Sequence, residues 1–144
     1  MIEIKRLKKA SAADLEVVNL LLKQLRIDAG AADATMDELQ EIVSDKNVAL
    51  VAIRDDNKLI GMATLYMITK FGKRVAFVED VVVDEAYRGQ GLGEKLMRAV
   101  IAIAREERVG TLNLTSRPER VAANKLYQKV GFELKNTNVY RLKL

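Results

Sequence analysis

Apolar positions in the first third of the chain recur with the spacing of helices. They return every three or four residues over 15–25, and again over the shorter stretch 39–43, as on a helix that buries one face. A capping-box sequence precedes each stretch, Ser11-Ala-Ala-Asp14 before the first and Thr35-Met-Asp-Glu38 before the second. Two helices are therefore predicted, the second ending near residue 45, after a first strand at 2–7.

The pattern changes to that of strands in the middle of the chain. Residues 48–54 and 59–69 alternate or run apolar and are separated by the polar turn 55–57. Residues 75–83 are rich in Val and Phe, as strands are. The three runs together predict an antiparallel meander.

The helical period returns over residues 91–107, and Gly110 is the expected C-cap signal. A strand at 111–115 is predicted next, and Ser116-Arg-Pro-Glu119 is expected to open a last helix, with Pro118 in its first turn. Two closing strands are then predicted, at 132–134 and 139–144.

Length and composition indicate one globular domain, residues 1–144. The 144 residues are 49% hydrophobic and 31% charged, with a single proline, which is enough for a core without a linker. No run approaches ~18 apolar residues, and no apolar segment follows the first charges. We therefore expect neither a signal peptide nor a membrane span, and a cytoplasmic protein.

The absence of two residue types excludes several kinds of chemistry. The chain has no His and no Cys, which removes a Cys/His nucleophile pair, a His base and the usual zinc site, and no metal is expected. None of the three serines lies in a GxSxG context. Acid–base chemistry must then come from Asp, Glu, Tyr, Lys or the chain termini. Direct transfer between two bound substrates fits this set best.

Residues 81–93, VVVDEAYRGQGLG, are the most informative stretch. A β-branched strand leads into Gly89, Gly91 and Gly93, and a helix follows, so free backbone amides and a helix N-terminus are expected to bind phosphate. The spacing fits neither a Walker A loop nor the dinucleotide fingerprint, which needs Gly or Ala where Glu94 stands.

The charge distribution agrees with an anionic ligand. Residues 88–129 hold nine Lys or Arg against four Glu, while the whole chain has a net charge of +4. Such an excess steers anions, although ordinary solvated surface is the alternative. Aromatic residues make up only 5% of the chain, so a nucleic-acid partner is not expected.

The motif Arg88-Gly89-Gln90-Gly91-Leu92-Gly93 fits the Arg/Gln-x-x-Gly-x-Gly/Ala pattern of the GNAT superfamily of acyl-CoA N-acyltransferases. Asn124 and Tyr127, followed by Gly131-Phe132, resemble the later signature of that family. The resemblance covers about the whole chain and is to a single-domain N-acetyltransferase of bacterial or archaeal type. It implies an α/β fold with a mixed central sheet, helices on both faces and the order β-α-α-β-β-β-α-β-α-β-β.

The resemblance also implies acetyl-CoA as co-substrate and assigns residues to it. The pyrophosphate would lie on the amides of residues 88–93, and the pantetheine arm beside Val81, Val82 and Val83, with the backbone of Val81 and Val83 pairing with it. Asn124 would bind the same arm, and Tyr127 would protonate the departing CoA thiolate. The alternatives are buried strand valines and a core tyrosine with a satisfied hydroxyl.

Glu79 and Asp80 are adjacent carboxylates within a strand, so in a regular strand one of them points inward. Burying an unpaired carboxylate is costly, and a role in taking the amine proton or binding the ammonium group is one explanation. We favour Glu79, and a salt bridge or an edge position is the alternative. A bulge would change which of the two points inward.

The predicted function is transfer of an acetyl group to a primary amine by direct attack in a ternary complex. The acceptor is a small-molecule or protein amine. Residues 78–84 resemble the corresponding strand of glucosamine-6-phosphate N-acetyltransferases, and Arg117 and Arg120 are candidates for an anionic acceptor. A homodimer through the closing strands is one further expectation, and no membrane partner is expected. The alternative function is a non-catalytic acyl-CoA sensor or interaction module.

Overall fold

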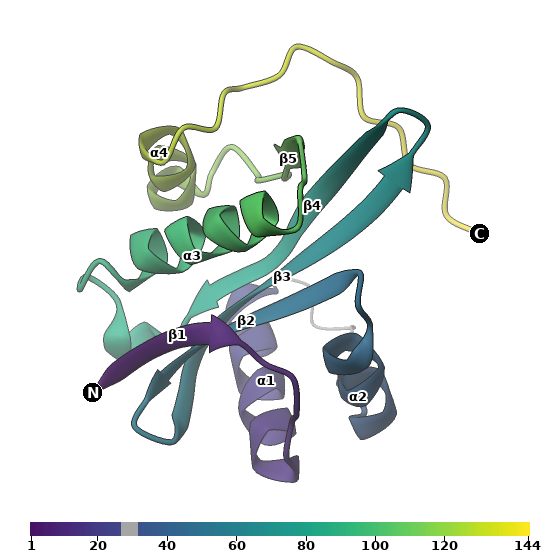
Figure 1. Cartoon of the computed structure of the whole chain (residues 1–144). Coiled ribbons are helices and arrows are strands. Elements are labelled where there is room, and N and C mark those ends of the chain that lie inside the picture. Colours follow the sequence, from purple (N-terminus) through teal and green to yellow (C-terminus); the bar gives the residue numbers. More distant parts are fainter. Residues whose placement is uncertain (27–31) are drawn as a thin grey trace.

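A computed structural model describes residues 1–26 and 32–144, and Figure 1 shows a sheet with helices on both of its faces. In chain order the elements are β1 (Ile2–Arg6), α1 (Ala12–Leu25), α2 (Met36–Ser44), β2 (Val48–Asp55), β3 (Lys58–Lys70), β4 (Lys73–Val83), the 3-10 turn η1 (Glu85–Tyr87), α3 (Leu92–Glu106), β5 (Thr111–Asn113) and α4 (Val121–Lys129).

Both predicted capping boxes are present and fix the starts of the first two helices. Ser11 Oγ accepts from the Asp14 amide at 3.1 Å, and the Asp14 carboxylate accepts from the Ser11 amide at 3.0 Å. Thr35 and Glu38 make the same reciprocal pair before α2. Each pair satisfies two of the amides that a helix start leaves without an acceptor.

The strand order is β1-β2-β3-β4-β5, and the sheet is mixed as predicted. The first four strands are antiparallel neighbours. β5 runs parallel to β4 over three residue pairs, from Val75 opposite Thr111 to Phe77 opposite Asn113. β4 continues to Val83 beyond this point, so its last six residues have no strand beside them on the β5 side within the described chain.

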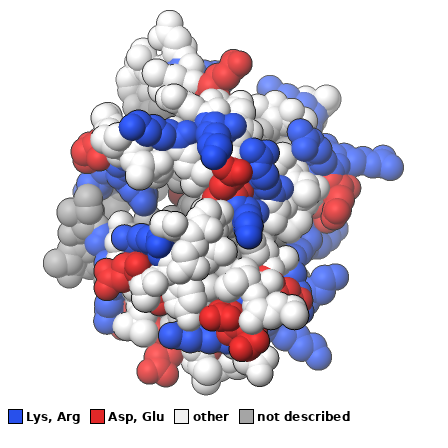
Figure 2. Space-filling view, turned by 90° about the vertical axis from the view of Figure 1, so that its left-hand side faces the viewer, with Lys and Arg blue, Asp and Glu red and all other residues white. Residues whose placement is uncertain are grey.

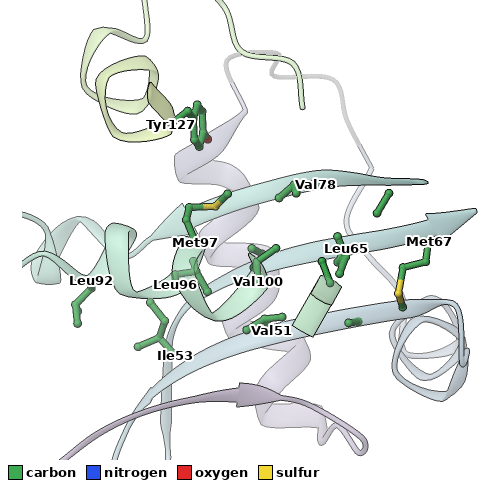
Figure 3. Close-up of a cluster of buried hydrophobic side chains, with 14 of the residues drawn as sticks. Val51, Ile53, Leu65, Met67, Val78, Leu92, Leu96, Met97, Val100 and Tyr127 are labelled. Atoms are coloured by element: carbon green, nitrogen blue, oxygen red, sulfur yellow. The ribbon is translucent and has the colours of Figure 1, made fainter. Parts of the chain in front are cut away.

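Two hydrophobic clusters hold the helices to the sheet. On one face α3 and α4 cover β2, β3 and β4, and Figure 3 shows Leu96, Met97 and Val100 of α3 against Val51, Leu65 and Val78 of the strands. On the other face α1 and α2 cover a second cluster that includes Leu21, Leu50 and Met62. Each strand therefore buries alternate residues on opposite faces, as its apolar run predicts.

The prediction that Ser116-Arg-Pro-Glu119 opens the last helix is wrong. The Arg120 amide donates to the carbonyl of Arg117 at 3.1 Å, which closes a turn around Pro118, and α4 begins afterwards at Val121 without a side-chain cap. Proline fits the second position of such a turn as well as a helix start, because both need the same φ.

Gly110 is not the residue that ends α3. Arg108 takes the left-handed conformation with φ of 60°, and the amide of Val109 returns to the carbonyl of Ala104 at 2.9 Å. The chain therefore turns two residues earlier than the glycine predicts, because the long polar arginine is tolerated there on an exposed surface.

The two closing strands predicted at 132–134 and 139–144 are not formed. The chain after α4 is extended but pairs with no strand in the described part of the protein, and Figure 1 shows it passing outside the sheet. A strand is stabilised by its neighbours, and β5 offers a ladder of only three residues. Large apolar side chains of this tail are consequently exposed: Leu134, Val139, Tyr140, Leu142 and Leu144. Over residues 1–26 and 32–144, no helix has the length and apolar character needed to cross a membrane.

Candidate active site

The free end of β4 presents unpaired backbone groups beside the glycine loop. The Asp84 amide donates to the carbonyl of Ile60 on β3 at 2.8 Å. Because the backbone groups of successive strand residues point to alternate sides, those of Val83 and Val81 point away from β3. This edge of β4 is the one with which β5 pairs only at residues 75–77.

The three valines differ in what they can offer. Val81 and Val83 are half-buried and pack toward α3. Val82 lies opposite Met62 of β3 and buries its side chain in the cluster under α1 and α2. Its backbone groups face β3, so Val81 and Val83 are the two that present donors and acceptors at the open edge.

A β-bulge lies at the carboxylate pair. Glu79 is opposite Thr64 and Val82 is opposite Met62, so two residues of β4 face one residue of β3. Asp80 is in the bulge with φ of 51°, which non-glycine residues adopt infrequently. The regular alternation therefore holds up to Glu79 and is broken at Asp80.

Glu79 lies on the sheet face that α1 and α2 cover, because its neighbour across the ladder, Thr64, alternates with residues of the other cluster. Burial and then the charge of Asp80 raise the pKa of the Glu79 carboxyl. Burial also raises the pKa of Asp80, while the positive charge of Arg26 opposes that rise. Glu79 is exposed and Asp80 is half-buried, and a raised pKa makes each carboxylate a better proton acceptor than an ordinary one.

The glycine loop has the conformation that an anion site requires. Gly89 and Gly91 have φ of 81° and 75°, and a Cβ added to either would meet no atom within 4 Å. Gly91 also precedes α3 without a side-chain cap, so the first amides of the helix remain available. Figure 2 views this face, and Lys and Arg side chains gather in its upper half.

Gly93 has a different role from the other two glycines. A Cβ there would lie 3.1 Å from the Leu126 side chain of α4. The missing side chain therefore lets α4 approach the start of α3. An ion pair of 2.7 Å between Lys129 and Glu94 joins the same two helices.

The side chain of Arg88, first residue of the loop, folds back onto the end of β4. Its Nε donates to the carbonyl of Val83 at 3.0 Å, and its terminal nitrogen lies 3.5 Å from the Gln24 amide oxygen of α1. The guanidinium thus occupies one of the acceptors at the open strand edge.

Tyr127 of α4 belongs to the hydrophobic cluster that α3 and α4 form with the sheet (Figure 3). The residue is only 7% exposed, and its ring meets Phe132 edge-on, with the ring centroids 6.1 Å apart. No hydrogen bond joins its hydroxyl to another residue in the described part of the chain. Burial raises the pKa of the phenol, and the charge of Arg120 opposes the rise.

Asn124 of α4 is hydrogen-bonded to the turn that precedes this helix. Its amide nitrogen donates to the carbonyl of Arg117 at 2.9 Å. This bond fixes the turn that precedes the helix and leaves the side-chain oxygen available. Arg117 itself is exposed, while Arg120 is half-buried.

Sequence reasoning missed three residues beside the site. Tyr66 lies across the ladder from Phe77, and burial, then Asp80 and Glu79, raise the pKa of its phenol. Arg26 follows α1 and acts on Asp80, and Gln24 contacts the loop. None belongs to a motif, and only the alternation of the strand places Tyr66 on the same face as Glu79.

A separate hollow of about 610 Å³ lies at the other end of the sheet. It is lined by residues at the starts of β2 and β4 and the ends of β1 and α3, including Arg6, Asn47, Arg74 and Glu107. None of the residues predicted for the site takes part in it.

Comparison with known proteins decides the family. A sequence profile described as the Acetyltransferase (GNAT) family matches residues 15–132, which contain the open end of β4, the glycine loop and α4. The chain belongs to the GNAT family of acetyltransferases. Acetyltransferases of this family use acetyl-CoA.

The curated relatives of this GNAT protein carry names with different acceptors. It is 29% identical over 145 residues to glucosamine 6-phosphate N-acetyltransferase 1 of Oryza sativa subsp. japonica, covering 95% of this chain and 86% of the relative. It is 36% identical over 78 residues to glucosamine 6-phosphate N-acetyltransferase of Trypanosoma brucei brucei, covering 52% and 51%. It is 34% identical over 97 residues to N-alpha-acetyltransferase RimI of Mycobacterium tuberculosis, covering 65% and 57%.

In the last two comparisons the chain spans little more than half of the relative's length. The relatives come from a plant, a trypanosome and a bacterium, so they do not single out a bacterial or archaeal type.

Solved structures confirm the predicted α/β GNAT fold. An acetyltransferase of Trypanosoma brucei superposes with a TM-score of 0.77 and 26% identity, and both chains are covered completely. AAC(6')-Iy in complex with the bisubstrate analogue CoA-S-monomethyl-acetylneamine gives a TM-score of 0.79 at 23% identity, covering 100% of this chain and 99% of that one.

Proposed function

We propose that this GNAT protein transfers the acetyl group of acetyl-CoA to a primary amine by direct attack in a ternary complex. The observation that carries the proposal is the open edge of β4, which bends at Asp80 and leads on into the glycine loop and the uncapped start of α3. Acetyl-CoA has pantetheine amides that could pair with the strand edge and a pyrophosphate that could bind the amides of the loop and the helix start.

The glycine loop and the first turn of α3 would hold the pyrophosphate through residues 88–93. The backbone of Val81 and Val83 would pair with the pantetheine amides beside them, as another strand would. Asn124 keeps an amide oxygen free for the same arm. These contacts would bring the thioester carbonyl to the bulge, between the carboxylates and Tyr127.

The amine would enter from the face where Glu79 and Asp80 lie. A primary amine has a pKa near ~10 and arrives mostly as ammonium, so a base must take its proton before attack. Glu79 accepts that proton, directly or through water. The C–N bond then forms and the C–S bond breaks.

Tyr127 would protonate the departing thiolate and recover its proton from solvent. The raised pKa of its phenol keeps the proton in place at neutral pH. The buried ring fixes the direction of the hydroxyl.

The decisive experiment is a panel of amines with acetyl-CoA and detection of free CoA. Glucosamine 6-phosphate, a peptide with a free N-terminus, a lysine peptide and an aminoglycoside represent the acceptors that the relatives and the sequence suggest. CoA release with one class supports the proposal and names the acceptor. Binding of acetyl-CoA without release to any amine, in a sample whose fold is intact, favours the non-catalytic sensor.

We also propose that two copies associate through the tail after α4. Tyr140, Leu142 and Leu144 alternate with Arg141 and Lys143, which is the pattern of a strand with one buried face, and all three apolar side chains are exposed. Light scattering would report a dimer for the full chain and a monomer for Leu142→Lys. A monomeric full chain would contradict this association.

A further inference from the structure

The segment between β4 and the glycine loop is held from the opposite side of the sheet by one side chain of α1. Gln24 lies in the last turn of α1, and its amide oxygen accepts from the backbone amide of Glu85 at 2.9 Å. The same oxygen lies 3.5 Å from the terminal nitrogen of Arg88. One acceptor thus contacts both ends of η1, although it comes from more than sixty residues earlier in the chain.

The loop depends on such outside contacts because it has few of its own. Around Gly89 and Gly91 there is open space within 4 Å of where a side chain would be. After the loop, Leu92 is buried in the cluster between α3 and the sheet and anchors the start of α3. Before the loop, Asp84 caps the Ala86 amide at 3.0 Å, the Tyr87 hydroxyl donates to the Asp55 carboxylate at 3.2 Å, and Gln24 accepts from the Glu85 amide.

Gln24 is also connected to the edge of β4 through Arg88. The Arg88 guanidinium donates to the Val83 carbonyl, an acceptor that the proposed function assigns to the pantetheine arm. A pantetheine amide that pairs with this carbonyl would compete with the guanidinium for the same oxygen, and the guanidinium is the group that can turn aside. The Gln24 oxygen is the acceptor within reach of the freed guanidinium.

We propose that Gln24 is a positioning residue for acetyl-CoA: it orients the glycine loop and receives Arg88 when the Val83 carbonyl pairs with the co-substrate. This inference rests on the proposed function of the same site. Gln24 touches neither acetyl-CoA nor the amine, so its effect falls on co-substrate affinity, while the acceptor and the chemical step are unaffected.

The test compares Gln24→Leu, which keeps the size and removes the acceptor, with Gln24→Glu, which retains an oxygen at the same distance. Lys23→Leu is the matched control, because it adds an exposed leucine to the same turn, and Lys23 makes no hydrogen bond to the loop in the described part of the chain. Acetyl-CoA dissociation constants from calorimetry, the KM for acetyl-CoA, kcat, and hydrogen exchange of the Glu85 amide are measured on each folded variant.

Gln24→Leu is expected to raise the dissociation constant and KM for acetyl-CoA about tenfold, the effect of losing two hydrogen bonds, with kcat within about twofold. The Glu85 amide should exchange faster. Gln24→Glu should stay within about threefold of the wild type, and Lys23→Leu should be unchanged.

Unchanged acetyl-CoA affinity in Gln24→Leu overturns the inference and leaves the proposed function standing. So does an equal loss in Gln24→Leu and Gln24→Glu, because the acceptor would then not be the property that matters. A wild-type protein that does not bind acetyl-CoA overturns the proposed function, and the role of Gln24 with it.

Discussion

The glycine loop and the carboxylate pair lie on the two sides of one strand end, but they are built from different chemical groups. The loop offers backbone amides, and their directions are set by the positive φ of Gly89 and Gly91. The other side offers the side chains of Glu79 and Asp80, and their directions depend on a bulge opposite β3. A backbone site keeps its geometry when neighbouring side chains change, whereas a side-chain site changes with each substitution.

This difference explains how one fold serves several acceptors. The relatives share a family of acetyltransferases, while two of them are named for glucosamine 6-phosphate and for N-alpha-acetyl transfer. We therefore expect substitutions in the loop to change co-substrate binding, and substitutions near the bulge to change turnover.

The largest effect is expected from Gly91→Val. A β-branched residue is strained at φ of 75°, and its side chain would fill the open space where we expect the phosphate. Acetyl-CoA affinity should fall by about 10²-fold or more, as expected when bound groups are displaced by an ångström. Gly72→Val is the matched control, because Gly72 has φ of 72° and equally open surroundings in the distant β3–β4 turn. Equal binding losses in both variants would trace the effect to strain alone.

Glu79→Gln tests the other side of the comparison. It keeps the shape but removes the base, so kcat at neutral pH should fall by about 10²-fold with acetyl-CoA binding intact. Asp80→Asn should have a smaller effect.

The pH dependence gives a second test of Glu79. A base works only when ionised, and the pKa of this carboxyl is raised, so kcat/KM should fall with decreasing pH already above the ordinary range of a glutamate. In Glu79→Gln this acidic limb should disappear, and the rate should recover partly as the pH approaches the pKa of the amine. An unaltered profile would assign the proton transfer to another group.

Tyr127→Phe is expected to slow turnover by about tenfold, less than the loss at Glu79, because a thiol with a pKa near ~8.5 leaves without much assistance. The affinity for acetyl-CoA should be retained. Tyr140→Phe, at an exposed position, is the control. If Tyr127→Phe lowers the melting temperature while each folded molecule turns over normally, the tyrosine belongs to the core and to nothing else.

The smallest effect is expected from Asn124→Ala. The variant loses the 2.9 Å bond to the Arg117 carbonyl, worth about 1 kcal/mol, so the KM for acetyl-CoA should rise a few-fold with little change in kcat. If Asn124→Ala lowers kcat more than Tyr127→Phe does, Asn124 acts in the chemical step and not only in binding acetyl-CoA.

The backbone half of the site was predictable from the sequence, because glycines at alternate positions after a valine strand determine where free amides lie. The capping boxes at Ser11 and Thr35 were predictable for the same reason, since each depends on residues three positions apart. The proximity of Gln24 to the loop was not, because it depends on how α1 packs across the sheet.

The bulge illustrates the same limit. An extra residue in β4 is defined only against β3, so no pattern within the strand reveals which way Glu79 and Asp80 turn. The closing strands failed for a related reason. The apolar residues of the tail do alternate, but a strand forms only where the edge of another strand is available for pairing. β5 is too short to offer such an edge, because it pairs over only three residues.

The kink at Asp80 has one more consequence, for solubility. An unpaired strand edge is a template on which other chains can add strands and aggregate, and β4 has such an edge over six residues. The left-handed turn at Asp80 interrupts it after two residues, and a charge stands at the break. A straight strand would have to bend at the same place to pair along the whole edge, so we expect the bend to hinder the addition of strands from other molecules.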